Sequence, residues 1–305
     1  MSEASGVYDG SRPSPHGTPE LVVVGAASRD VTPDDPRGWR LGGAVSYASL
    51  AAARLGLRVG CVIGVDGPAS TATELDQLEA AGVRIRRVPL AHGPVFENIE
   101  RGGHRRQRWH SQSDRVPAAA LPDEWRATRG WLLGPVAGEL GPEWADLAAG
   151  EGARVAVGWQ GMLREFDPDG WVKRVDATPS AILASAGLVC ASLDDLGPGA
   201  QLADLRAFAP GARVILTAGD RGGLVARGRH LFRYPAIAAG TVVDPTGAGD
   251  VFLAALMAVW LRHGDLATPR ALRFAAAAGS CAVEAPGLAG VPTEAQVADR
   301  LSRPT

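Results

Sequence analysis

The sequence contains very little lysine, few cysteines and no paired cysteine motif. Lys173 is the only lysine among 31 basic residues, so a phosphate clamp or Schiff base built on lysine would have to use that one side chain. The three cysteines, Cys61, Cys190 and Cys281, are widely spaced and form no C-x-x-C pair. This spacing excludes a disulfide framework and a thiolate metal site. It suits a reducing compartment, so we expect a cytoplasmic protein.

An excess of charge of one sign is also missing. The 31 basic and 33 acidic residues give a formal net charge of -2. A binder of nucleic acid or of an anionic membrane would need a basic excess or a basic stripe, so we expect a small-molecule partner, no nucleic acid and no membrane. The longest apolar run, Val251–Leu261, is far shorter than the roughly 20 residues that cross a bilayer. It predicts a buried helix.

The first 18 residues are polar and rich in serine, glycine and proline. They have neither the basic start nor the apolar stretch of a signal peptide, so we predict a disordered tail over residues 1–18. Hydrophobic residues make up 46% of the chain, which is enough to bury a substantial core. We therefore predict one large domain over residues 19–302.

From Leu21 onward, short β-branched runs alternate with alanine-rich amphipathic stretches. This alternation predicts an α/β fold with a doubly wound, mostly parallel sheet joined by crossover helices. Strands are expected at 21–26, 58–65, 83–88, 131–134, 154–158, 187–191 and 213–217. Helices are expected at 43–55, 69–81, 142–149, 179–186 and 198–208. A hairpin at 223–235 should precede a helical stretch over 248–284 that breaks near Gly264.

Two segments do not fit this alternation. Residues 31–41 hold a Pro-Asp-Asp-Pro turn, and residues 94–111 have the pattern of two strands around the Gly102-Gly103 turn. They could form a small β lid over one end of the main sheet. The alternative is that both are surface hairpins without a functional role.

The segment Asp244–Asp250, with the sequence Asp-Pro-Thr-Gly-Ala-Gly-Asp, directly precedes the apolar run. Small residues let backbone N–H groups approach a ligand, and the first N–H groups of a helix are unpartnered and lie at the positive end of its dipole. The segment therefore predicts an anion site, although it lacks the Gly-Lys-Ser/Thr step of a P-loop. Asp250 would repel a bound phosphate, so we expect it to accept a proton from an attacking hydroxyl. The alternative is an acid that only caps the helix.

A second glycine motif lies near the N-terminus, Gly42-Gly43-Ala-Val-Ser-Tyr47, with Arg54-Leu55-Gly56 after it. Together the two motifs resemble, in order, the two signatures of the ribokinase (PfkB) family of sugar and nucleoside kinases. The resemblance covers the chain from Leu21 to about Thr293. It implies an eight- or nine-stranded sheet with a β lid, and ATP as the phosphate donor.

The resemblance also implies roles for single residues. Asp250 becomes the base that deprotonates the acceptor hydroxyl, and the backbone of Gly247, Ala248 and Gly249 becomes the hole for charge on the transferred phosphoryl group. Thr217, Gly219 and Gly222 fall on the turn against the nucleotide. The acceptor site falls on Asp30, Gly42, Gly43 and Tyr47. For Asp30, an exposed loop acid is the alternative.

Cation sites follow from the same resemblance. The family's Asn-x-x-Glu motif, which organises Mg²⁺ through water, corresponds here to Ser192-Leu-Asp194-Asp195. The acid at the last position, Asp195, is kept and the amide is lost. Some members also hold a monovalent cation such as K⁺. The corresponding positions here are Asp244, Thr246, Ala282, Ala285 and Gly287.

The substrate is narrowed by Gln160-Gly-Met-Leu-Arg164, which resembles a Gln-x-x-x-Arg stretch of the family's myo-inositol kinase branch. An amide and a guanidinium together offer a donor-rich fork for adjacent hydroxyls. Alternatively, Arg164 could pair with Glu165 or Asp167 on the surface. Tyr47 replaces an asparagine often found in the family's Gly-Gly helix, which argues against a plain ribokinase.

We therefore expect an ATP-dependent kinase of a sugar or cyclic polyol, with inositol-like acceptors favoured and a homodimer through the lid compatible with the family. The alternatives are a pentose or nucleoside kinase, a phosphosugar kinase, and a non-catalytic sugar-sensing protein. The phosphosugar alternative would use basic lid residues that are otherwise a solvated face, namely Arg101, Arg105, Arg106 and Arg108. A dinucleotide oxidoreductase would need Gly-x-Gly-x-x-Gly after the first strand, where Gly25-Ala-Ala-Ser-Arg-Asp30 supplies one glycine.

Overall fold

The computed structural model describes residues 17–101, 104–150, 152–197, 199–200, 206–264 and 268–303. Residues 1–16 of the predicted tail at 1–18, the Gly102-Gly103 turn and most of the predicted helix at 198–208 lie outside these residues, as do the side chains of Arg101 and Arg105. Within the described residues, no helix is both long enough and apolar enough to cross a membrane.

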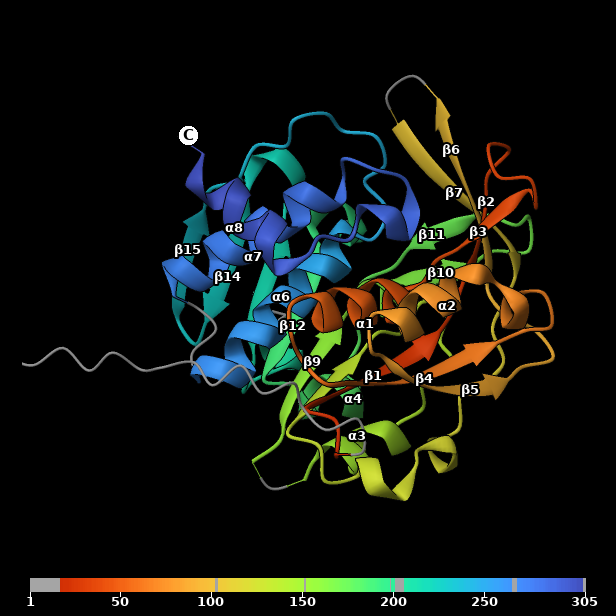
Figure 1. Ribbon diagram of the computed structural model, residues 1–305, viewed down its shortest axis with the longest axis horizontal. Coiled ribbons are helices and arrows are strands. Elements are labelled where there is room, and N and C mark those ends of the chain that lie inside the picture. The colour runs from red at the N-terminus through yellow and green to blue at the C-terminus, as the bar shows by residue number, and fades with distance from the viewer. Residues whose placement is uncertain are drawn as a thin grey trace, which may run out of the picture.

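In the described part of the chain, a nine-stranded sheet has the order β15-β14-β13-β12-β9-β8-β1-β4-β5 (Figure 1). Its strands are β1 (Leu21–Ala26), β4 (Val59–Val65), β5 (Arg84–Pro89), β8 (Gly130–Leu133), β9 (Arg154–Gly158), β12 (Leu188–Ser192), β13 (Arg213–Thr217), β14 (Gly223–Arg227) and β15 (His230–Tyr234). In this order, each neighbouring pair from β13 across to β5 is parallel, whereas the pairs β13–β14 and β14–β15 are antiparallel. The predicted doubly wound, mostly parallel sheet is confirmed.

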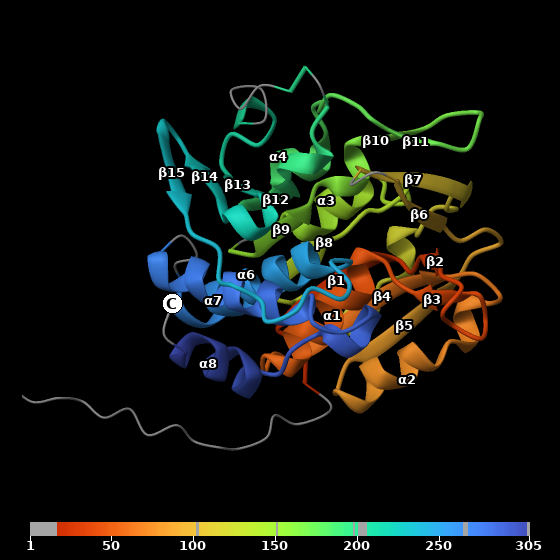
Figure 2. The same ribbon diagram turned by 90° about the horizontal axis from the view of Figure 1, so that it is seen from above.

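Helices cover both faces of this sheet (Figure 2). One face carries α1 (Ala44–Arg54), α2 (Thr73–Ala80), α6 (Ala248–His263) and α7 (Pro269–Ala282), and α8 (Glu294–Ser302) packs on α7. The other face carries α3 (Glu143–Ala148) and α4 (Ala181–Ser185). Side chains of β1 alternate between the two apolar clusters, because successive residues of a strand point to opposite faces. This strand therefore lies at the centre of the core.

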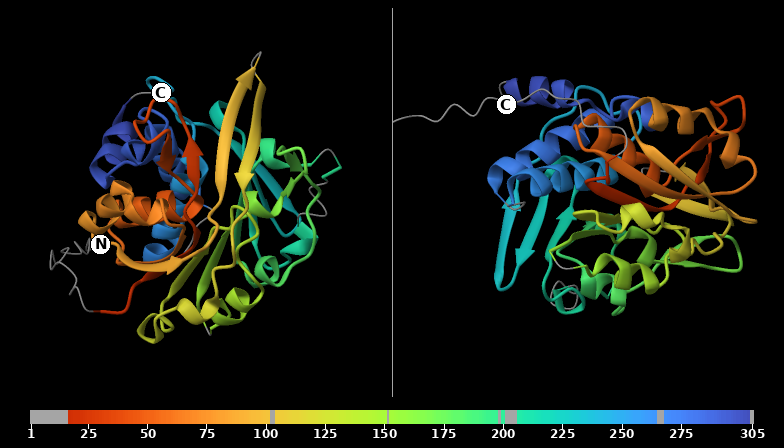
Figure 3. Two further views of the ribbon diagram at one scale, coloured as in Figure 1. Left: turned by 90° about the vertical axis from the view of Figure 1, so that its right-hand side faces the viewer. Right: turned by 60° about the horizontal axis from the view of Figure 1, so that its bottom comes forward.

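The two segments that did not fit the alternation come together in a second sheet. It has the order β3-β2-β6-β7 and consists of β2 (Arg29–Val31), β3 (Trp39–Leu41), β6 (Val95–Arg101) and β7 (His104–Ser111). Its long hairpin projects beside one end of the main sheet (Figure 3). A further hairpin, β10 (Arg164–Phe166) with β11 (Val172–Arg174), borders β7, where the Trp109 N–H donates to the Gly170 carbonyl at 3.0 Å.

The chain winds outward from β1 in two directions. It first builds β4 and β5 on one side of β1, and then β8, β9, β12 and β13 on the other. The loops that follow β1 and β8 therefore diverge at the carboxyl edge of the sheet. Ligands of open α/β sheets bind at such a switch point.

Candidate active site

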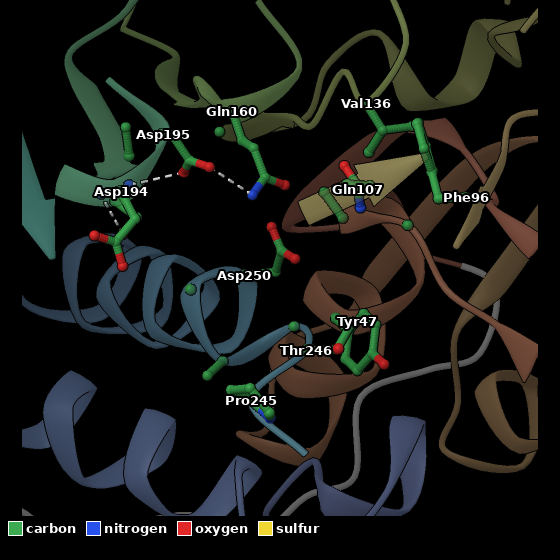
Figure 4. Close-up of a pocket in the computed structure, with 18 of the residues that line it drawn as sticks. Tyr47, Phe96, Gln107, Val136, Gln160, Asp194, Asp195, Pro245, Thr246 and Asp250 are labelled. Carbon is green, nitrogen blue, oxygen red and sulfur yellow. Dashed lines mark hydrogen bonds between the residues drawn. The ribbon is translucent and has the colours of Figure 1, made fainter. Parts of the chain in front are cut away.

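A cavity of about 910 Å³ opens at this carboxyl edge (Figure 4). The loops after the parallel strands and the first turn of α6 contribute to its wall. The second sheet, β3-β2-β6-β7, which we call the lid sheet, also contributes. Of the residues predicted for the site, the lining contains Asp30, Gly43, Tyr47, Gln160, Arg164, Asp195, Thr217, Gly219, Thr246, Gly247, Ala248, Gly249 and Asp250. The other predicted residues, which lie outside this lining, are Gly42, Gly222, Asp244, Ala282, Ala285 and Gly287.

The predicted anion hole is the start of α6. Gly247 precedes the helix with a φ of 78°, a left-handed conformation that L side chains rarely adopt. A β-carbon at this position would lie 2.2 Å from Cδ1 of Tyr47, so the close packing of the tyrosine ring also requires glycine here. The backbone of Gly247, Ala248 and Gly249 faces the cavity at the positive end of the helix dipole.

Asp250 lies in the first turn of α6 and also faces the cavity (Figure 4). The residue at the helix start, Gly247, has no side chain that could cap the helix. Burial raises the pKa of the Asp250 carboxyl to about 7, with a further increase from Asp195 and Asp30 and a decrease from Arg164. A carboxylate with a pKa near neutrality is well suited to accept a proton at physiological pH.

Asp30 lies in β2 on the lid side of the cavity. Its Oδ1 accepts a hydrogen bond from the Ser28 hydroxyl at 2.8 Å. A β-carbon at Gly42 would lie 2.2 Å from the other carboxylate oxygen, so Gly42 makes room for the acid. The neighbouring Arg29 donates to Asp66 from Nε at 3.0 Å and from Nη2 at 2.8 Å. This ion pair anchors β2 and hence the position of Asp30.

Tyr47 connects the acceptor side to the anion hole. The residue lies in α1 and is only 3% exposed. Burial raises the pKa of the Tyr47 phenol, so the side chain stays neutral. Its ring packs against Gly247, which places a large, uncharged side chain against the start of α6.

Gln160, Arg164 and Asp195 form one network. Gln160 Nε2 donates to Asp195 Oδ1 at 2.9 Å (Figure 4), and Arg164 Nη2 lies 4.0 Å from the same oxygen. The Ser192 N–H donates to Asp195 Oδ2 at 3.1 Å. The residues predicted for the acceptor and for Mg²⁺ are thus in contact. The described residues contain no cluster of three His, Cys, Asp or Glu side chains that could hold a metal directly.

The single lysine does not take part in this site. Lys173 Nζ pairs with Asp167 Oδ2 at 3.1 Å, and Lys173 lies outside the cavity lining. On the nucleotide side, Thr217 and Gly219 line the cavity. Gly222 instead closes the turn behind them, because its carbonyl accepts from the Ala218 N–H at 2.7 Å.

The residues predicted for a monovalent cation gather beside the anion hole. Asp244 accepts hydrogen bonds from the Thr246 N–H at 2.9 Å and from the Gly287 N–H at 3.1 Å. Ala282 is the last residue of α7, and Ala285 follows in the same connection. The carboxylate thus joins the two segments that would have to supply the ligands.

Sequence reasoning missed the polar residues of the lid. Asn98, the only asparagine of the chain, and Gln107 line the cavity. Gln107 Nε2 donates to Asn98 Oδ1 at 3.0 Å across the β6–β7 hairpin, beside the Phe96 ring. The sequence indicated two strands around a turn here, but it could not show which face of the hairpin looks into the cavity.

A second residue without a sequence signal is Glu139, which is fully buried. Its carboxylate accepts backbone N–H groups of Ala26 at 3.1 Å, Val136 at 3.0 Å and Ala137 at 2.8 Å. Burial raises the pKa of Glu139 against the opposing effect of these hydrogen bonds. The side chain thereby ties the end of β1 to the loop after β8, which are the two edges of the switch point.

Comparison with known proteins identifies this arrangement. The sequence profile described as pfkB family carbohydrate kinase matches residues 168–295, which include the anion hole and Asp250. This part of the chain is similar to the pfkB family of carbohydrate kinases. The resemblance of the second glycine motif, Asp244–Asp250, to this family is therefore confirmed.

Two curated relatives show the range of this family. An inositol 3-kinase of Arabidopsis thaliana is 35% identical over 178 residues, which are 57% of this chain and 48% of that enzyme. A cytidine kinase of Thermococcus kodakarensis is 27% identical over 272 residues, or 81% of this chain and 90% of that enzyme. The chain thus spans about half the length of the inositol 3-kinase that it matches.

Solved structures show the same fold. A pyrophosphate-dependent kinase in the ribokinase family, complexed with a pyrophosphate analog and myo-inositol, superposes with a TM-score of 0.73 at 18% identity and covers 92% of this chain and 99% of its own. Arabidopsis thaliana ribokinase, complexed with ribose and ATP, superposes with a TM-score of 0.67 at 18% identity and covers 94% of this chain and 100% of its own. At this identity the likeness establishes the ribokinase fold.

Proposed function

We propose that this protein is a kinase that transfers a phosphoryl group from ATP to a hydroxyl of a sugar or cyclic polyol, with inositol-like acceptors favoured. The observation that carries this proposal is the position of Asp250. It lies in the first turn of α6, in the cavity, next to the backbone of Gly247 and Gly249. A hydroxyl held against Asp250 could lose its proton to the carboxylate while the transferred group lies against the helix start.

The acceptor end of the cavity is lined by groups that suit neutral hydroxyls. Asp30 can accept hydrogen bonds, and Asn98 and Gln107 carry both donors and acceptors. Gln160 and Arg164 line the same cavity, and the Arg164 guanidinium lies 5.8 Å from the centre of the Phe96 ring. This mixture of donors and acceptors supports a polyol, as does the 35% identity to an inositol 3-kinase.

Other acceptors of the same reaction remain alternatives. The cytidine kinase match extends over 81% of this chain, which favours a nucleoside as the second candidate. A phosphosugar would need basic lid side chains in the cavity. Arg106 lines the cavity, but its guanidinium lies 3.8 Å from the centre of the Trp171 ring. A pentose kinase and a sugar-sensing protein without catalysis would use the same pocket.

The donor end supports a nucleotide with Mg²⁺. Asp194 and Asp195 line the cavity beside Thr217, and carboxylate oxygens suit Mg²⁺, which usually keeps several of its waters. We propose that Asp195 holds a water of the Mg²⁺ shell, and that Mg²⁺ neutralises charge on the donor phosphates. We further propose a K⁺ site at Asp244, the neighbouring carbonyls and Gly287.

The lid sheet gives two related proposals. We propose that residues 31–41 and 94–111 close over the acceptor, since Phe96, Asn98 and Gln107 already face the cavity. A homodimer formed through the lid would cover Val31, which is 37% exposed at this edge. Light scattering at several protein concentrations tests the dimer, because a constant monomer mass contradicts it.

A product assay tests the proposed function. The purified protein is incubated with Mg²⁺, with ATP or pyrophosphate, and with a panel of inositols, pentoses, nucleosides and sugar phosphates, and the products are read by mass spectrometry. We expect an increase by one phosphoryl group for an inositol-like polyol with ATP. Phosphorylation of a nucleoside alone would replace the polyol assignment, and no product from any pair would favour the sensor.

A further inference from the structure

The C-terminal helix contacts the loop before α6 through one buried side chain, Arg300. α8 packs against α7 on the outer side of the helix layer (Figure 2). From α8 the Arg300 side chain points inward and is only 6% exposed. A charge taken so far out of water destabilises the fold unless it is paired and hydrogen-bonded. The partners of Arg300 therefore indicate what this residue does.

One of these partners lies in the loop before α6, and the others lie at the end of α7. Arg300 Nη1 donates to the Ala238 carbonyl and to the Ser280 hydroxyl, each at 3.1 Å. Its Nη2 donates to Glu284 Oε2 at 2.6 Å. The other carboxylate oxygen of Glu284 accepts a hydrogen bond from the Gly240 N–H. The ion pair thus holds the loop at two residues, because Arg300 binds Ala238 and Glu284 binds Gly240.

This loop leads directly into the anion hole. Residues 236–246 connect β15 to α6 and contain no helix or strand. Farther along, the Val243 and Asp244 N–H groups donate to the Val283 carbonyl at 2.7 and 3.1 Å, while the Val242 side chain is 65% exposed. The position of the loop therefore depends on the end of α7 and on the Arg300–Glu284 pair. Within the loop, Ile237 packs against the core, whereas Val242 and Val243 are mostly exposed.

We propose that Arg300 and Glu284 are positioning residues for the phosphate donor. They hold the loop so that the backbone of Thr246 and Gly247 faces the transferred phosphoryl group. This inference rests on the proposed kinase function. Charge-assisted hydrogen bonds are stronger than neutral ones and are directional, which suits a pair that fixes a loop without regular structure. The acceptor residues Asp30 and Gln107 lie on the lid side and are not held by this pair.

The test compares five variants with the parent protein: Arg300→Met, Glu284→Ala, their double variant, Arg300→Lys and a control. Arg300→Met removes the guanidinium and keeps an apolar stem, and Glu284→Ala removes the partner, whose side chain is 31% exposed. The matched control is Arg303→Met at the C-cap of the same helix, because Arg303 pairs at the surface with Asp299 at 2.6 Å. KM for ATP, KM for the acceptor, kcat and Tm are measured for each variant, together with hydrogen exchange of residues 236–246.

We expect Arg300→Met and Glu284→Ala each to raise KM for ATP about tenfold, which corresponds to about 1.4 kcal/mol, with little change in KM for the acceptor. The double variant should lose less than the sum of the two single losses, because both single variants remove the same ion pair. Arg300→Lys, which keeps the charge but loses the fork, should recover part of the loss. The Arg303→Met control should match the parent.

A lower Tm with unchanged KM for ATP in both Arg300→Met and Glu284→Ala would overturn the inference, since it would mean that the pair only holds α8 in place. Failure of the parent protein to phosphorylate any acceptor would instead refute the proposed function. In that case hydrogen exchange still decides the structural part. Exchange over 236–246 should rise in Glu284→Ala if the pair fixes the loop, and unchanged exchange would contradict it.

Discussion

Asp250 combines a position in the cavity with a raised carboxyl pKa. Its carboxyl lies where a phosphate should bind, and burial together with Asp195 and Asp30 raises its pKa to about 7. A base with this pKa is strong enough to take a proton from a hydroxyl and is still largely unprotonated slightly above neutral pH. The burial that makes the site suitable for a phosphoryl group therefore also prepares the base.

Replacing this base gives the first prediction. Asp250→Asn keeps the shape of the side chain but cannot accept the hydroxyl proton, so we expect kcat to fall by about 10²-fold or more. Binding of ATP should be unchanged or tighter, because the repulsion between carboxylate and phosphate is lost. Steady-state kinetics and nucleotide titration measure the two effects.

The matched control is Asp220→Asn, which changes an exposed carboxylate of the neighbouring turn that does not line the cavity. It should behave like the parent protein. If Asp250→Asn retained more than about a tenth of the parent kcat, a general-base contribution of the usual size would be ruled out.

The second prediction distinguishes a neutral polyol acceptor from a phosphorylated sugar. If Arg164 donates to hydroxyls of a neutral polyol, Arg164→Ala should raise KM for the polyol by about tenfold or more, since a hydrogen bond to a charged group contributes about 1.5–3 kcal/mol. KM for ATP should change little. Kinetics with both substrates varied measure this split, and Lys173→Met serves as a control on the same hairpin.

Asp30→Ala provides an internal standard, because any sugar or polyol reading needs a carboxylate on the acceptor. Loss of activity in Asp30→Ala without loss in Arg164→Ala would keep the kinase and reject the inositol-like acceptor. Damage by Arg106→Ala on a phosphorylated sugar, with that sugar as the best substrate, would support the phosphosugar alternative.

At the scale of elements, the sequence predicted the main sheet well. Strands buried on both faces are continuous β-branched runs, as in β1 and β4, and such runs are unambiguous between helical segments. The shorter elements were missed. β10 and β11 have three residues each, too few for any periodicity to appear. α8 was also missed, although Thr293 and Gln296 form the capping box that marks a helix start.

The site was predictable to the extent that it is local in sequence. Asp250 and the anion hole occupy one short segment, so their chemistry could be inferred from their order alone. Asn98, Gln107 and Glu139 reach the site only because separate elements pack together. Their roles depend on which face of the lid hairpin looks inward and on which backbone groups are left near the switch point. A single sequence does not contain that information.

The third prediction concerns the lid as an element. If residues 31–41 and 94–111 close over a bound acceptor, their amides should exchange hydrogen more slowly when the polyol and a non-hydrolysable nucleotide are added together. The exposed strand β15, on the far edge of the main sheet, is the internal control and should not change. Equal exchange with and without ligands in both lid segments would mean that they are surface hairpins without a functional role.

At the scale of the whole molecule, the two apolar clusters are joined through the sheet. Val22 and Val24 of β1 belong to one cluster, and Leu21 and Val23 belong to the other. Loss of either cluster exposes half of the same strand. The core therefore has no internal boundary at which one part could unfold and leave the other intact, which is the physical content of the single domain predicted over 19–302.

The last prediction follows from this cooperativity and from Asp250. Thermal unfolding should be a single transition by near- and far-UV circular dichroism.

The pKa of Asp250 is about 7 in the folded protein against an ordinary 3.8, so the unfolded chain releases this proton more readily. A raised carboxyl pKa destabilises the fold progressively as pH rises from about 4 to 7. Asp250→Asn removes this effect and should raise Tm above that of the parent at pH 8, with little difference near pH 4. Asp220→Asn should show no such pH dependence. An Asp250→Asn shift of equal size at both pH values would mean that the carboxylate is not held in a desolvated site.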